Sequence, residues 1–181
     1  METRTAFHKR LQEIQDDVLS MGSMVEKAIA RSIEGLKKRD LSLSHQVIAD
    51  DARINQQRFL TEDKCIELIA TQQPAASDLR TIVAVLNIIT ELERIGDYAE
   101  GIAKIAILIG DEPPLKPLID IPRMADIAVD MTRRAVAAFM NRDVEEAKAI
   151  CKADDEVDAL WDQVYRELLT YMLQDPKKIT Q

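Results

Sequence analysis

Aromatic residues, glycine, proline, cysteine and histidine are all scarce in this chain. Of its 181 residues 4% are aromatic, and there are five glycines, six prolines, two cysteines and two histidines. Sheet proteins use more aromatic and turn-forming residues, so the composition favours long helices packed through Leu, Ile, Val and Ala. Cys65 and Cys151 are too few for a disulfide framework, which favours a reducing compartment.

The chain also lacks an excess of positive charge. It has 24 Lys and Arg against 32 Asp and Glu, a net charge of −8, so we expect no nucleic-acid partner. Apolar runs such as 102–110 contain a lysine and are shorter than the roughly 20 residues that span a bilayer. The first ten residues lack the apolar core of a secretion signal. We therefore expect a cytoplasmic protein without a membrane-spanning segment.

Apolar residues recur every three or four positions along most of the chain, which is typical of amphipathic helices. The pattern predicts an all-α fold, with Ser77 as the N-cap of the third helix. The predicted helices span residues 6–37, 43–71, 77–109, 122–140 and 144–174.

Residues 110–117 hold three of the six prolines and read as a linker. We place a first unit at 1–109, the linker at 110–122 and a second unit at 123–181. The second unit repeats the first at an offset of 103 residues, which superposes Arg39-Asp40 on Arg142-Asp143. The sequence thus predicts tandem antiparallel three-helix bundles, the second of which lacks its third helix.

Two helices that evolved to cover a third would leave an apolar patch on the second unit. Soluble monomers avoid such patches, so either a partner covers it or the sequence is a fragment, and we expect a fragment. The residues expected in the patch are Phe139, Ile150, Trp161, Val164 and Leu168.

Acidic pairs spaced by four residues are the candidate metal ligands. Glu93 and Asp97 share one face of the third helix, and Asp51 and Asn55 share a face of the second at a similar height in the hairpin. Oxygen ligands at one level suit hard or borderline cations. The repeat adds Asp154 and Asp158, and the mid-helix Gly96 suggests a close approach between helices.

Simpler interpretations compete with a metal site. Charged pairs at this spacing also occur on solvated helix faces, and Arg94 could form a surface ion pair as readily as bind an anion. In the repeat, each cysteine is equivalent to an apolar residue of the other unit, so we expect both cysteines in the core. No Glu-x-x-His, nucleotide-binding loop or nucleophile elbow occurs. We therefore expect no enzyme, although a metal-dependent phosphate-handling hydrolase or a metal-free helical scaffold are alternatives.

The repeated helical units and their motifs resemble the PhoU family of phosphate-transport regulators. The resemblance covers essentially the whole chain. It is carried by Leu79-Arg80, by the Glu-Arg-Ile-Gly-Asp run at 93–97, and by the Asp-rich run at 153–158. A departure from the family is the absent sixth helix, which in its members bears a second acidic motif.

The resemblance implies a cytoplasmic negative regulator of phosphate transport and of the phosphate-starvation response. Such a protein is an adaptor between a sensor histidine kinase and the ATPase subunit of the phosphate ABC transporter, and it is expected to form a homodimer. The resemblance also implies bound transition-metal ions, iron or zinc. Their ligands would be Asp51, Asn55, Glu93 and Asp97, with Asp154 and Asp158 in the second unit.

Overall fold

The computed structural model describes residues 2–176, and within that range the chain forms five α-helices and no strand. The predicted all-α fold is confirmed. α4 begins at Asp120, whereas the predicted helix began at Pro122. The helices are α1 (Glu2–Lys38), α2 (Leu41–Gln72), α3 (Ala76–Ile109), α4 (Asp120–Asn141) and α5 (Val144–Gln174). None of them is long and apolar enough to cross a bilayer.

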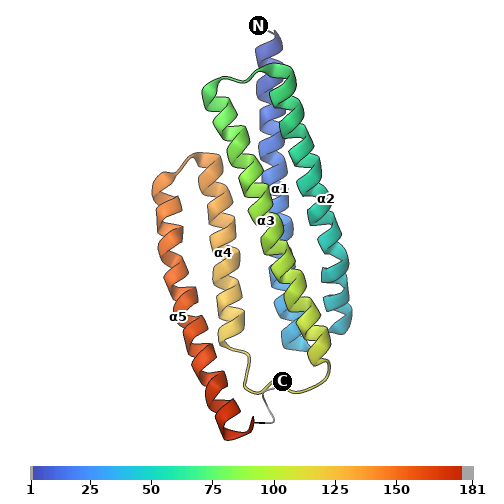
Figure 1. Cartoon of the computed structure of the whole chain (residues 1–181), viewed down its shortest axis with the longest axis vertical. Coiled ribbons are helices and arrows are strands. Elements are labelled where there is room, and N and C mark those ends of the chain that lie inside the picture. The colour runs from blue at the N-terminus through green and yellow to red at the C-terminus, as the bar shows by residue number, and fades with distance from the viewer. Residues whose placement is uncertain (1, 177–181) are drawn as a thin grey trace.

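The helices lie side by side along the long axis of the molecule (Figure 1). α1, α2 and α3 each pack against the other two and form a three-helix bundle. α4 packs against α1, and α5 packs against α4 alone among the helices of the described range. The second unit is therefore a helix pair attached to one side of a bundle.

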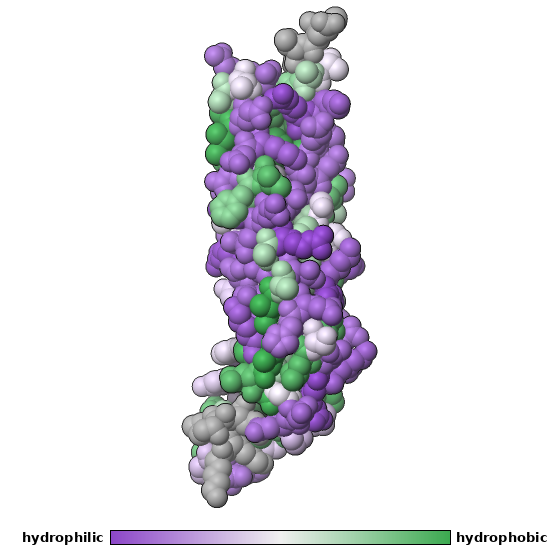
Figure 2. Space-filling view, turned by 90° about the vertical axis from the view of Figure 1, so that its right-hand side faces the viewer, coloured by the Kyte–Doolittle hydropathy of each residue, from purple (hydrophilic) through white to green (hydrophobic). Residues whose placement is uncertain are grey.

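The main hydrophobic core lies inside the α1–α2–α3 bundle. Its fully buried side chains include Val18, Met21, Leu68, Ile82 and Ile89. α4 and α5 have fewer buried residues, because only one face of each helix is covered. The side of the molecule on which α2 lies is predominantly hydrophilic, with hydrophobic residues in smaller patches that are largest towards the lower end of the view (Figure 2).

The turns after α1 and α4 have the same local structure, as the repeat predicts. Arg39 and Arg142 adopt left-handed conformations with φ of 55° and 56°. The following aspartates cap the next helix in the same way. Asp40 accepts a hydrogen bond from the Leu43 amide at 2.9 Å, and Asp143 accepts one from the Glu146 amide at 2.9 Å. The offset of 103 residues therefore relates equivalent structural positions.

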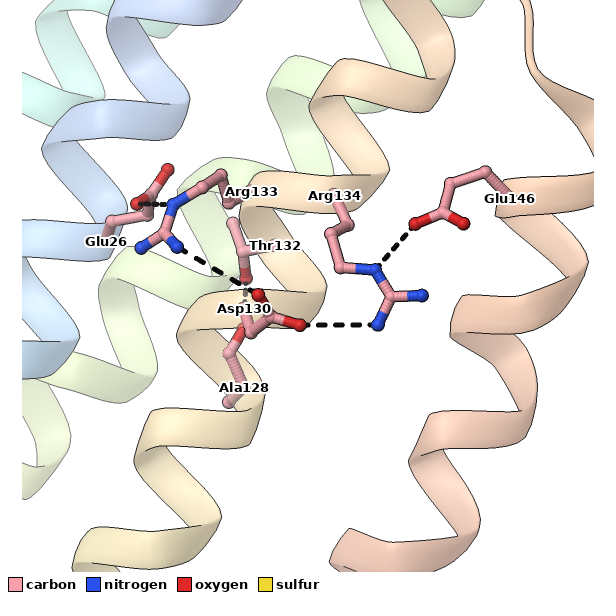
Figure 3. A network of polar contacts seen from close by, with 7 residues as sticks. All are labelled: Glu26, Ala128, Asp130, Thr132, Arg133, Arg134 and Glu146. Carbon is pink, nitrogen blue, oxygen red and sulfur yellow. Dashed lines mark hydrogen bonds and ion pairs between the residues drawn. The ribbon is translucent and has the colours of Figure 1, made fainter.

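A close contact and an ion-pair network join α4 to its neighbours. A Cβ added at Gly22 of α1 would lie 3.2 Å from Val136 of α4, so the two helices approach closely there. Arg133 of α4 donates to Glu26 of α1 at 3.0 Å, and Arg134 donates to Glu146 of α5 at 2.6 Å (Figure 3). We call the α1–α4 part of this contact the joint.

Three expectations need correction. Ser77 does not cap α3, because the helix begins at Ala76 and Ala75 takes the N-cap position. Ile150 is buried rather than part of an exposed patch, because α5 packs against α4. Cys151 is exposed rather than in the core, because no third helix packs on that face of α5 in the described residues.

The remainder of the expected patch is partly exposed. The Trp161 side chain is 56% exposed and stacks on Tyr165, with ring centroids 5.4 Å apart. Phe139 is half-buried and packs against the core, and Val164 and Leu168 are half-buried as well. Within the expected patch, the exposed aromatic side chain is therefore that of Trp161 on α5.

Candidate functional site: an acidic cluster between α2 and α3

Asp51 of α2 faces Gly96 of α3 at the level that the hairpin geometry predicts. A Cβ added at Gly96 would lie 3.4 Å from Asp51 Oδ1 and 3.1 Å from Ile54 Cδ1. The absent side chain of Gly96 therefore gives the aspartate its place between the helices. Asp51 Oδ2 accepts a hydrogen bond from Asn55 Nδ2 at 2.8 Å.

The other oxygen of Asp51 is buried and has no hydrogen-bond partner. Burial raises the pKa of the Asp51 carboxyl, and repulsion from Asp97, Glu100 and Glu93 raises it further. Three carboxylates of α3 thus act on one buried carboxylate of α2. We call Asp51, Glu93, Asp97 and Glu100, with Asn55, the acidic cluster.

Sequence reasoning missed Glu100. It lies one helical turn beyond Asp97, and this spacing was a signal that it shares the same face. Its carboxylate pairs with Lys104 at 2.6 Å, within its own helix. Arg94 makes a surface ion pair with Glu91 at 2.7 Å. Its hydrogen bonds to Glu91 and Tyr98 raise the pKa of its guanidinium. Arg94 is therefore bound by residues outside the acidic cluster.

The acidic cluster has the charge and oxygen chemistry that a cation would neutralise. An orphaned carboxylate oxygen near further carboxylates matches the ligand preference of hard and borderline ions. As the side chains stand, however, no three His, Cys, Asp or Glu residues in the part of the chain that the structure describes are grouped closely enough to hold a metal ion. The helices bring the charges together without forming a finished coordination site.

The second predicted pair is placed differently. Asp154 and Asp158 are both exposed on α5, and within the described range the only helix that packs against α5 is α4. The repeat equates them with Asp51, which lies against Gly96 of α3, and with Asn55, which donates to Asp51. Without a corresponding helix in the described residues, no glycine or carboxylate faces them as Gly96 and Asp97 face Asp51.

We expect Asp51→Asn to stabilise the metal-free fold by about 1 kcal/mol at pH 7 to 8, because the substitution removes a buried charge that lacks a partner. The folded-state pKa of Asp51 is raised, so protonation favours the folded wild type. The advantage of the variant should therefore decrease as the pH falls through that pKa towards the unfolded value near about 4. Urea unfolding followed by circular dichroism across this pH range, with a chelator present, measures it.

Asp63→Asn is the matched control for this substitution. Asp63 lies on the same helix but is exposed, so the variant has the same change in net charge without the change in burial. We expect little effect from it at any of these pH values. Equal effects of the two variants would contradict the burial of an unpaired carboxylate at position 51.

Comparison with known proteins identifies one family over most of the chain. The model of the PhoU domain matches residues 18–106 and again 121–181. A PhoU homolog from Aquifex aeolicus, named a phosphate-specific transport system accessory protein, is 42% identical over 171 residues, which cover 94% of this chain and 77% of that protein. The PhoU protein of Escherichia coli K12 is 32% identical, over 96% of this chain and 72% of its own.

Solved structures give the same result. The crystal structure of PhoU from Pseudomonas aeruginosa superposes with a TM-score of 0.91 at 32% identity, covering 96% of this chain and 84% of that one. The phosphate transport system regulatory protein PhoU from Streptococcus pneumoniae has a TM-score of 0.86 at 24% identity, covering 93% and 80%, which supports the fold alone. With a domain model that matches twice and relatives similar over nearly its whole length, this chain belongs to the PhoU family.

Proposed function

We propose that this chain is a regulatory accessory protein of a phosphate transport system. Specifically, it acts as a cytoplasmic negative regulator of phosphate uptake and of the phosphate-starvation response. The observation that carries the proposal is the 42% identity to an accessory protein of that system over 94% of the chain. The names of the curated relatives, which describe accessory proteins, also favour a role without catalysis.

The adaptor mechanism that we propose is occupancy of partner surfaces. Long, exposed helix faces offer area for the ATPase subunit of the transporter and for a sensor histidine kinase. α5 supports this, because it combines the exposed Trp161–Tyr165 stack with eight acidic and three basic residues. An aromatic centre within a charged surface is a common composition for a binding site. A second copy of the chain is a further proposed partner.

The proposed role of a metal ion is to neutralise the acidic cluster. Iron or zinc held by Asp51, Asn55, Glu93 and Asp97 would supply positive charge where the pKa of Asp51 is raised. The residues of the chain would hold and orient the ion, and Gly96 would leave the space. A weaker cation at Asp154 and Asp158 would depend on ligands from outside α4 and α5.

Regulation and adaptor binding can be tested in a bacterium that lacks its own accessory protein. In phosphate-rich medium, the chain should lower expression from a phosphate-starvation promoter. It should also co-purify with the histidine kinase or the transporter ATPase subunit. Trp161→Glu, which places a charge at the centre of the exposed stack, should weaken a complex that uses α5. Unchanged promoter activity together with no complex with either protein would refute the proposal.

A metal-free helical scaffold is the second candidate function. It is favoured by the observation that no three potential ligands in the described residues are grouped to hold a metal. Under this alternative, Glu93→Gln combined with Asp97→Asn would leave promoter repression and partner binding unchanged. Under the first proposal the same variant should reduce at least one of them. The two candidates are therefore separated by one double variant in the same assay.

A further inference from the structure

A groove of about 350 Å³ runs between α1 and α2, outside the acidic cluster. Val47 and Ile54 form part of its lining and are buried, with 2% and 3% of their surfaces exposed. Met24 and Ala28 of α1 line it too and are half-buried. The groove therefore has an apolar floor, and its polar chemistry comes from a few charged side chains.

The groove is basic, although the chain is acidic. Lys27, Arg31 and Arg53 line it together with a single carboxylate, Asp50, in a chain with a net charge of −8. Lys27 and Arg31 are four residues apart on α1, a spacing at which like charges repel. Lys27 has no ion-pair or hydrogen-bond partner among the described residues. An anion in the groove would relieve this repulsion.

Arg31 is held in position by α2. Its Nη1 donates to Asp50 Oδ2 at 2.6 Å, and its Nη2 donates to Gln46 Oε1 at 3.0 Å. A guanidinium has five N–H donors, so these two contacts leave others available for a ligand. Because the planar group is already fixed, less side-chain entropy is lost when it binds an oxyanion.

Asp50 determines which anion suits the groove. Its Oδ2 accepts from Arg31, and its Oδ1 lies 3.8 Å from Arg53 Nη1, so the carboxylate has capacity to accept another hydrogen bond. A fully deprotonated anion such as sulfate would be repelled by this group. Inorganic phosphate still carries a P–OH group at neutral pH, whereas a phosphate monoester is mostly a dianion without one.

We propose that the α1–α2 groove binds inorganic hydrogen phosphate. Lys27, Arg31 and Arg53 donate to its oxygens, and Asp50 accepts the hydrogen bond of its P–OH group. This goes beyond an adaptor role, because it gives the chain a direct phosphate ligand of its own. The argument depends on the groove and not on any partner protein, so a negative result in the promoter assay would leave it open to a separate test.

Titration of the isotope-labelled, metal-free chain with sodium phosphate, followed by amide chemical shifts, tests the proposal. At constant ionic strength, phosphate should cause saturable shifts at residues 27, 31 and 50, and sodium sulfate should bind at least about fivefold more weakly. Lys27→Gln should weaken phosphate binding by about fivefold without loss of fold, because this side chain is exposed and unpartnered among the described residues. Asp50→Asn should narrow the preference for phosphate over sulfate.

Lys64→Gln is the charge-matched control, since Lys64 is another exposed lysine, paired with Asp17 of α1 at 2.6 Å, and does not line the groove. It should bind phosphate as the wild type does. The proposal would be overturned by shifts that never saturate, by equal binding of sulfate and phosphate, or by equal weakening in Lys64→Gln and Lys27→Gln. Equal binding of the two anions would identify a general anion surface instead.

Discussion

Met21→Ala should lower the free energy of unfolding by about 3 kcal/mol. Met21 is fully buried in the core of the α1–α2–α3 bundle, among side chains contributed by all three helices. Truncation removes apolar contacts on every side and leaves a cavity that long, rigid helices cannot readily close. Urea unfolding followed by circular dichroism measures the loss.

Met124→Ala is its matched control, because Met124 is the same residue type 103 positions later, on α4. Its side chain is half-buried, so we expect a loss of only about 1 kcal/mol. The two substitutions are chemically identical, and the positions differ in how far the side chain is buried. Equal losses would contradict a core concentrated in the first bundle.

Loss of metal binding is the second large effect that we expect. Glu93→Gln combined with Asp97→Asn should weaken binding of Zn²⁺ or Fe²⁺ at least about 100-fold, because it removes two carboxylates that act on Asp51. Binding should also strengthen as the pH rises through the raised pKa of Asp51, since a metal ion displaces that proton. Equilibrium dialysis with elemental analysis measures both effects.

Asp154→Asn combined with Asp158→Asn provides the control for that experiment. This variant has the same change in charge, but both side chains are exposed on α5, which packs only against α4 among the described helices. We expect this variant to bind Zn²⁺ or Fe²⁺ as tightly as the wild type does. If the α5 variant lost the ion and the α3 variant kept it, the acidic cluster would not be the metal site. If neither bound a stoichiometric ion, the metal-free scaffold would be the better description.

Helical periodicity and the repeat were sufficient to predict the α-helices and the matching turns. Arg39 and Arg142 adopt the same left-handed conformation because each precedes a capping aspartate in the same local sequence. The helix N-terminus at Ala76 was missed, because a good capping residue at position 77 does not prevent the helix from starting before it.

The site was only partly predictable, because exposure depends on which helices pack together. The similar height of Asp51 and Glu93 was predicted by counting residues away from the turn, and the mid-helix Gly96 indicated a close approach. Glu100 was missed although its spacing from Asp97 places it on the same helix face, because its spacing from Lys104 is also typical of a surface ion pair. Cys151 and Ile150 are neighbours with opposite exposure, and only the position of α4 explains the difference.

The joint between α1 and α4 has a mechanical consequence. In the described range α5 packs closely against no helix other than α4, so α4 and the segment before it, where Lys116 pairs with Glu167, are its main connections to the bundle. A movement of the α4–α5 pair relative to the bundle would therefore depend on the joint, where Gly22 and Val136 approach closely. A protein that binds α5 and displaces it would therefore act on the α1–α2 groove and on the acidic cluster without contacting either of them.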